Sequence, residues 1–178
     1  FAQSGQYRSL PVSTEILADV KTPIEVLRIL QNVSGHCFLL ESAEDNKQWG
    51  RYTFLGFEPK LELACLNGTV YQNGSPIACA HPNDAIRAVL AENKGPRLPY
   101  LPPFAGGLVG YFAYDYIKYF EPTLNLDAKD IEGFRDVDLM LFDKLIAFDN
   151  LRQKIILIVN IPLDDVETNY PAAVRELH

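Results

Sequence analysis

Three polar side chains stand close together in the sequence, beside apolar segments. Glu41 and Ser42 end the strand-like stretch FLLES, and Arg51 begins the next one, GRYTF. If the two stretches pair as a hairpin, a carboxylate, a hydroxyl and a guanidinium group meet beside apolar walls such as Leu40 and Tyr52. Such a set suits a free amino acid, whose ammonium group would bind Glu41 and whose carboxylate would bind Arg51. A surface ion pair between Glu41 and Arg51 is the simpler alternative.

Capping signals and apolar periodicity predict the helices that surround this hairpin. Residues 22–35 combine Thr22 as N-cap, a proline in the first turn and a glutamate three residues after the cap, which predicts a helix that ends near residue 35. Residues 83–95 carry apolar side chains on one helical face and predict a second helix. Residues 164–177 look helical, with an interruption near Pro171.

Strand-like segments fill most of the remaining chain. Residues 36–42, 50–59 and 61–78, which include two Asn-Gly pairs, predict a meander of four or five antiparallel strands. Residues 138–149 and 154–162 predict further strands. Helices mixed with antiparallel strands indicate an α+β protein.

Other motifs that could bind a phosphate or a metal ion are better explained by structural roles. The glycine-rich segment 105–110 lacks the spacing of a phosphate loop, and we interpret its glycines as sites of close packing. Asp136, Asp138 and Asp143 lack the spacing of a calcium loop and are interpreted as solvated or capping residues. The three cysteines and three histidines show no metal-ligand spacing.

Charge and hydropathy restrict the partners. The net charge of −7 and the pI near 4.9 argue against nucleic acid and anionic membranes as partners. No apolar run approaches the ~20 residues that span a bilayer, and the first residues lack the apolar core of a signal peptide. We therefore expect a cytoplasmic location. A start without Met and an end within a helix-like segment suggest an excised fragment.

Three blocks, in the same order, resemble the N-terminal portion of the anthranilate synthase component I family. They are PVSTEILADVKTPIEVL, FLLESAE with WGRYTFLGFEP, and PPFAGGLVGYFAYDYIKYFE, and the stretch FDKLIAFDNLRQKIILI follows them. The resemblance extends from about Leu10 to Ile161. It implies packed antiparallel sheets covered by helices, an α+β fold of which this chain is the N-terminal part.

The resemblance implies that residues 1–178 form the regulatory, tryptophan-binding region of an enzyme that converts chorismate to anthranilate and pyruvate. That enzyme uses Mg²⁺, and a glutamine amidotransferase, component II, delivers its ammonia. The chorismate- and metal-binding residues of the family lie in its C-terminal portion, whose motifs are absent here. We expect this fragment to be inactive alone, with no catalytic or metal-binding residue, and expect an unpaired sheet edge to favour homo-oligomers.

The family binds the inhibitor L-tryptophan around an L-L-E-S motif. Leu39, Leu40, Glu41 and Ser42 match this motif here, and Arg51 matches a nearby basic position. Aminodeoxychorismate synthase component I, from folate biosynthesis, shares several of these blocks and stays an alternative. A stand-alone amino-acid-binding regulatory module and a purely structural or interaction protein are alternatives of other classes.

Overall fold

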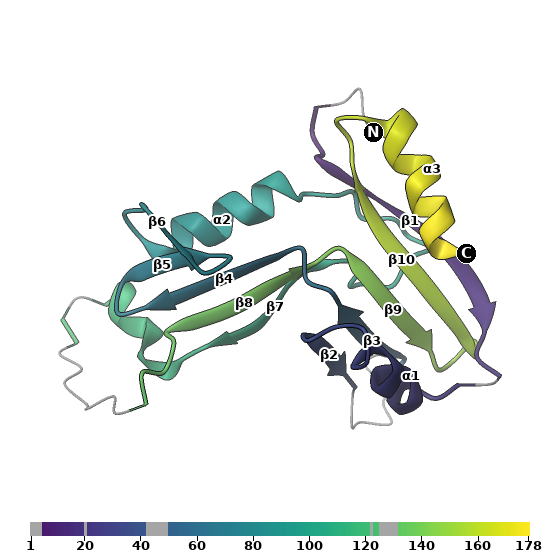
Figure 1. Cartoon of the computed structure of the whole chain (residues 1–178), viewed down its shortest axis with the longest axis horizontal. Coiled ribbons are helices and arrows are strands. Elements are labelled where there is room, and N and C mark those ends of the chain that lie inside the picture. The colour runs from purple at the N-terminus through teal and green to yellow at the C-terminus, as the bar shows by residue number, and fades with distance from the viewer. Residues whose placement is uncertain (1–4, 20, 42–49, 122, 125–131) are drawn as a thin grey trace. The chain divides into compact units, whose positions relative to one another are not determined.

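The chain divides into two compact units. The computed structural model describes residues 5–19, 21–41, 50–121, 123–124 and 132–178. Unit 1 comprises residues 1–59, 93–107 and 142–178, and unit 2 comprises residues 60–92 and 108–141. Each unit builds its own five-stranded antiparallel sheet (Figure 1). The prediction of antiparallel sheets with helices is confirmed.

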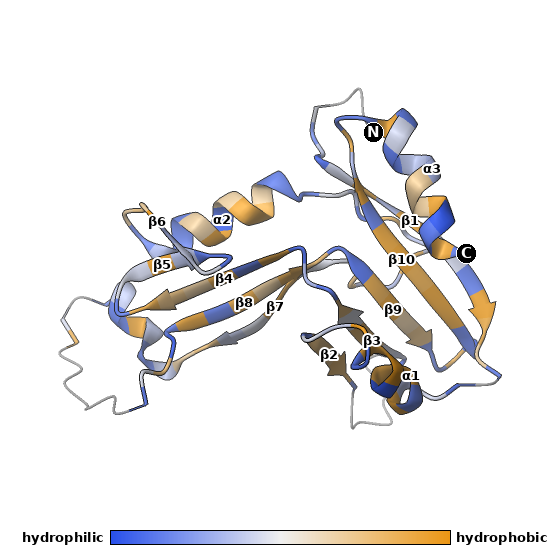
Figure 2. Ribbon diagram, viewed as in Figure 1, coloured by the Kyte–Doolittle hydropathy of each residue, from blue (hydrophilic) through white to orange (hydrophobic). Residues whose placement is uncertain are grey.

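The sheet of unit 1 has the strand order β1-β10-β9-β3-β2. Its strands are β1 (Ser9–Leu17), β2 (Cys37–Leu40), β3 (Tyr52–Phe57), β9 (Lys144–Asp149) and β10 (Lys154–Pro162). Figure 2 shows β9 and β10 hydrophobic along most of their length, as expected for central strands with residues buried on both faces. Helix α3 (Val166–Leu177) packs on β10 and β1.

Helix α1 (Pro23–Leu30) begins with the predicted capping box. The Thr22 hydroxyl accepts a hydrogen bond from the backbone N–H of Glu25 at 3.3 Å, and the Glu25 carboxylate accepts one from the N–H of Thr22 at 2.9 Å. These bonds satisfy backbone donors that a helix start leaves unpaired. The helix ends at Leu30, earlier than predicted. It covers β2 and β3 over a buried cluster that contains Leu30, Leu55, Phe148 and Ile155.

The sheet of unit 2 has the strand order β6-β5-β4-β8-β7. Its strands are β4 (Leu61–Leu66), β5 (Thr69–Gln72), β6 (Ser75–Ile77), β7 (Gly107–Phe112) and β8 (Val137–Phe142). The two predicted Asn-Gly turns join β4 to β5 and β5 to β6, with positive φ at all four residues. This conformation is typical of tight hairpin turns and favours Asn followed by Gly.

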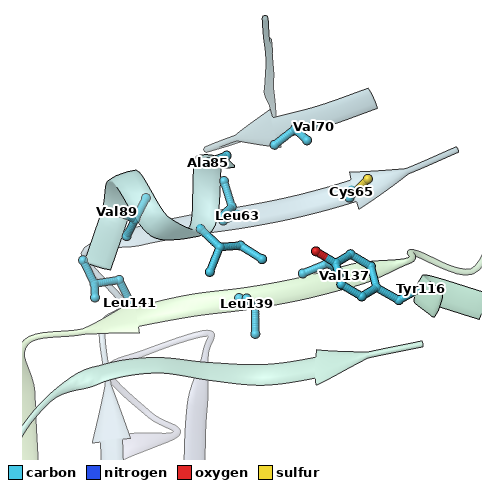
Figure 3. Close-up of a cluster of buried hydrophobic side chains, with 10 residues drawn as sticks. Leu63, Cys65, Val70, Ala85, Val89, Tyr116, Val137, Leu139 and Leu141 are labelled. Atoms are coloured by element: carbon cyan, nitrogen blue, oxygen red, sulfur yellow. The ribbon is translucent and has the colours of Figure 1, made fainter. Parts of the chain in front are cut away.

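One face of this second sheet is covered by α2 (Pro82–Glu92) and by the 3₁₀ helix η2 (Tyr114–Tyr119). Figure 3 shows Ala85 and Val89 of α2 directed toward Leu63 and its neighbours on the sheet. The buried cluster comprises Leu63, Cys65, Val70, Ala85, Ile86, Val89, Tyr116, Val137, Leu139 and Leu141. Tertiary packing of this apolar face stabilises α2, which ends at Glu92.

Two strand predictions were wrong in their connectivity. The predicted meander is divided, because β2 and β3 belong to the sheet of unit 1 and β4 to β6 belong to that of unit 2. Between β3 and β4, Glu58 has a φ of 48° and Pro59 has no N–H to donate, so the ladder cannot continue. The predicted strand 138–149 is likewise two strands, β8 and β9, in different sheets.

The predicted interruption of the last helix was also wrong. Helix α3 runs through Pro171. A proline inside a helix removes one hydrogen bond to the carbonyl group four residues earlier. Here that residue is Glu167, and both residues are exposed, so water can bind the carbonyl group.

The hydroxyl group of Tyr116 is buried without a hydrogen-bond partner in the described part of the chain. An unpaired buried hydroxyl loses its bonds to water without compensation. We expect Tyr116→Phe to leave the free energy of unfolding unchanged or to raise it by about 1 kcal/mol, as measured by urea unfolding. A clear loss of stability would show that this hydroxyl group has a partner.

Candidate functional site

The apolar end of the candidate site lies at the end of the edge strand β2. Leu40 is the last residue of this strand and is 48% exposed, and Glu41 follows it, also exposed. Leu40 pairs with Phe54 of β3, so the predicted hairpin is present. Ser42 lies outside the described residues. The strand therefore presents Leu40 and Glu41 to solvent, where a ligand can reach them.

A row of aromatic rings follows Leu40 and Phe54 over this sheet. The ring of Phe54 lies 5.8 Å from that of Tyr52 and 5.6 Å from that of Phe104. The ring of Phe38 meets Phe142 edge-on at 4.8 Å and covers Gly56, whose added Cβ would lie 2.9 Å from two carbons of that ring. Edge-on contacts of this kind hold aromatic rings in fixed orientations. The row gives the site a rigid apolar floor.

Arg51 is held at the other end of the site by a buried carboxylate. Its Nε donates to Oδ1 of Asp149 at 3.0 Å and its Nη2 donates to Oδ2 at 2.6 Å, so the contact is bidentate. The Asp149 side chain is 1% exposed and that of Arg51 is 30% exposed. The Arg51 guanidinium also lies 4.8 Å from the centre of the Tyr52 ring. The pair thus fixes the orientation of the Arg51 guanidinium group and neutralises its charge.

Asp149 is ionised at neutral pH, because its hydrogen-bond donors lower its pKa by more than its burial raises it. Burial alone favours the neutral carboxyl group, but the hydrogen bonds from Arg51 and from the backbone N–H of Arg152 hold the pKa of Asp149 below its usual range. The alternative ion pair of Arg51 with Glu41 is not formed. No signal in the sequence indicated the Asp149 partner, because 97 residues separate it from Arg51 in the chain.

A groove of about 570 Å³ opens beside Arg51 and Tyr52. Its other wall is the proline-rich segment 97–103, and its lining comprises Arg51, Tyr52, Arg97, Leu98, Pro99, Leu101, Pro102 and Pro103. The lining combines two guanidinium groups with an aromatic ring and apolar side chains. The volume lies within the range of small-molecule sites, roughly 300–1,000 Å³.

Unit 2 contains a second polar cluster that the sequence analysis missed. Asp136, interpreted above as solvated or capping, is buried and accepts hydrogen bonds from Lys118 Nζ at 2.6 Å and from the Tyr119 hydroxyl at 2.7 Å. Burial raises the pKa of Asp136, but these donors outweigh it and hold that pKa below its usual range. Burial is the main cause that raises the pKa of Tyr119. The cluster joins η2 to the residue before β8 around a buried carboxylate, so we assign it to structure.

The hydroxyl groups of Tyr116 and Tyr119 form a matched pair for testing that cluster. The Tyr119 hydroxyl donates to a buried carboxylate, whereas the Tyr116 hydroxyl has no partner among the described residues. We expect Tyr119→Phe to lower the free energy of unfolding by about 1–3 kcal/mol, because the buried carboxylate of Asp136 loses one of its hydrogen bonds. Urea unfolding of both variants side by side tests this prediction, and equal stability of the two would contradict it.

The described part of the chain contains neither a metal-binding cluster nor a membrane-spanning helix. No group of three or more His, Cys, Asp or Glu side chains gathers there in a way that could hold a metal ion. The same part contains no helix of sufficient length and hydropathy to span a membrane.

A family model for chorismate binding enzymes matches residues 35–176 of the chain. The chain belongs to the chorismate binding enzyme family. Two curated relatives carry the name anthranilate synthase component 1. Anthranilate synthase component 1 of Acetivibrio thermocellus is 37% identical over 96% of this chain and 35% of its own length. That of Acinetobacter calcoaceticus is 36% identical over 98% of this chain and 37% of its own length.

A solved member of the family has the same fold. The crystal structure of anthranilate synthase component I from Streptococcus pneumoniae TIGR4 matches with a TM-score of 0.59 and 27% identity, over 91% of this chain and 35% of that one. This match confirms the α+β fold and the resemblance read from the three sequence blocks. The chain thus spans about 35% of the length of these relatives.

Proposed function

We propose that the chain is the N-terminal part of an anthranilate synthase component I. The complete enzyme is a lyase that converts chorismate and ammonia to anthranilate and pyruvate, in the cytoplasm. One observation carries the proposal: relatives 35–37% identical over at least 96% of this chain are all named anthranilate synthase component 1. That name implies a second component, for which a glutamine amidotransferase that delivers ammonia is the proposed partner.

The proposed role of this part is feedback regulation by L-tryptophan at Leu40, Glu41, Ser42 and Arg51. Its support is the L-L-E-S motif together with the geometry of the described residues. Glu41 is exposed at a strand end, where a carboxylate can accept hydrogen bonds from an ammonium group. The aromatic row beside it offers apolar surface for an indole ring. Residues 1–178 alone are proposed to be inactive, and Mg²⁺ is proposed to bind elsewhere in the complete enzyme.

Product identification with the complete protein tests the proposal. Chorismate, ammonium and Mg²⁺ should yield anthranilate and pyruvate, identified by mass, and tryptophan should suppress their formation. Aminodeoxychorismate as the product would move the protein to the folate branch. Absence of any product would contradict the enzyme assignment.

Replacement of Ser42 tests the regulatory part separately. We expect Ser42→Ala to make anthranilate formation less sensitive to tryptophan, because a hydroxyl that orients the ligand is lost. Ser75→Ala, at an exposed serine of β6 in unit 2, is the matched control and should retain wild-type inhibition. Equal sensitivity of both variants would remove Ser42 from the site.

A further inference from the structure

The 3₁₀ helix η2 of unit 2 exposes apolar side chains on its outer face. Tyr114 is 91% exposed, Ile117 is 46% exposed, and Phe120, which follows the helix, is 57% exposed. Side chains three residues apart in a 3₁₀ helix lie one above the other, and the backbone N–H of Phe120 still bonds the carbonyl oxygen of Ile117 at 2.9 Å. Tyr114, Ile117 and Phe120 therefore form one apolar stripe, which we call the η2 stripe.

The opposite face of η2 is anchored within unit 2. Tyr116 is part of the buried cluster (Figure 3). Lys118 Nζ and the Tyr119 hydroxyl donate to the carboxylate of Asp136 at 2.6 and 2.7 Å, and His81 Nε2 donates to the carbonyl oxygen of Tyr119 at 2.7 Å. A surface held at several points loses little conformational freedom when it binds a partner. The η2 stripe is therefore presented in a fixed geometry.

The uncompensated charges beside the η2 stripe are acidic. Asp115 lies in the first turn of η2 and Glu121 follows Phe120, and both side chains are exposed. Neither forms an ion pair with another residue that the structure describes. Lys118, the one basic residue of the helix, is neutralised by Asp136. The stripe thus combines an apolar centre with negative charge at its edge.

This charge indicates which kind of protein fits the η2 stripe. A second copy of the chain, packed stripe against stripe, would bring acidic side chains against Asp115 and Glu121, and like charges oppose association. A different protein with apolar side chains bordered by Lys or Arg would match both the stripe and its edge. Tyr and Phe are enriched in protein interfaces, whose centres are apolar and whose rims are polar.

We propose that the η2 stripe is a docking surface for a partner protein whose contact face is apolar and bordered by basic residues. The assignment rests on the proposed function, in which that partner is the second component that delivers ammonia. Tyr114, Ile117 and Phe120 supply the apolar contact, and Asp115 and Glu121 supply the complementary charge. Loss of docking removes glutamine as the source of ammonia, whereas free ammonium still reaches the complete enzyme.

Two rates of the complete enzyme, mixed with a limiting amount of its purified second component, test this proposal. They are anthranilate formation from glutamine and from ammonium. Tyr114→Ala should lower the ratio of the glutamine-dependent rate to the ammonium-dependent rate by about tenfold or more, because an aromatic contact at the centre of the interface is lost. Leu90→Ala, at a side chain of α2 that is 48% exposed, is the control and should keep the wild-type ratio.

Reversal of a charge at the edge of the η2 stripe tests the complementary charge. Asp115→Lys should also lower the ratio of the two rates, because it places a cation against the basic residues of the partner. Salt screens charges between exposed groups. The difference between Asp115→Lys and the wild type should therefore shrink as the salt concentration rises.

Thermal unfolding of the complete enzyme without its partner distinguishes docking from a structural role. Tyr114→Ala should melt at the wild-type temperature, because its side chain is 91% exposed. If its melting temperature drops and both of its rates fall together, other parts of the complete protein cover the stripe and the assignment is wrong. A wild-type ratio in both Tyr114→Ala and Asp115→Lys would also overturn it. If the wild type forms no anthranilate from ammonium, the proposed function itself fails.

Discussion

We expect Gly110→Ala to lower the free energy of unfolding by at least about 3 kcal/mol. Gly110 lies in the edge strand β7 of unit 2, against β8. A Cβ atom at this position would clash with the carbonyl oxygen of Asp138 and lie 2.9 Å from the Asp138 carbonyl carbon and from Cα of Leu139. All of these atoms belong to the backbone, so no side-chain rotation can make room.

Chemical unfolding of Gly110→Ala and of a control variant tests this prediction. Gly35→Ala is a suitable control, because nothing lies within 4 Å of a Cβ added there and its φ is not positive. The Gly35→Ala variant should be as stable as the wild type or slightly more stable, because alanine restricts the conformations of the unfolded chain. Similar stabilities of the two variants would show that β7 does not lie close to β8.

We expect Arg51→Met to lower the free energy of unfolding by about 3 kcal/mol at neutral pH, because it leaves the buried carboxylate of Asp149 without its cation. Methionine retains much of the apolar stem, so the loss reports mainly on the charge. Arg28→Met, at an exposed arginine, should differ little from the wild type. Urea unfolding of the three proteins measures the effect.

The pH dependence of this difference gives an independent test. The folded-state pKa of Asp149 is lower than normal, so its contribution to stability is complete above the unfolded-state pKa of about 3.9. It is lost as the pH falls through the lower folded-state pKa, where the carboxylate becomes protonated. The difference between wild type and Arg51→Met should therefore shrink below about pH 4. A constant difference down to pH 2 would exclude Asp149 as the cause.

Local signals determined the elements whose causes lie within a few residues. The capping residues at Thr22 and Glu25 predicted the start of α1, and the Asn-Gly pairs predicted the turns of β4 to β6. These predictions succeeded because a cap or a tight turn depends on the dihedral angles and hydrogen bonds of adjacent residues. The three blocks of resemblance likewise identified the family without any structure.

The sequence alone also indicated where a regulatory ligand would meet the chain, through Leu40, Glu41, Ser42 and Arg51, and this site stays a prediction. Tertiary structure decided which groups surround it. Asp149 and segment 97–103 are far from this motif in the chain, and they meet Arg51 and Tyr52 only because β9 pairs with β3 and the segment lines the groove beside Tyr52. The alternation of apolar residues reveals that a segment is a strand but not which strand it pairs with. For that reason the division of residues 138–149 between two sheets, and the burial of Asp136, became visible only in the folded chain.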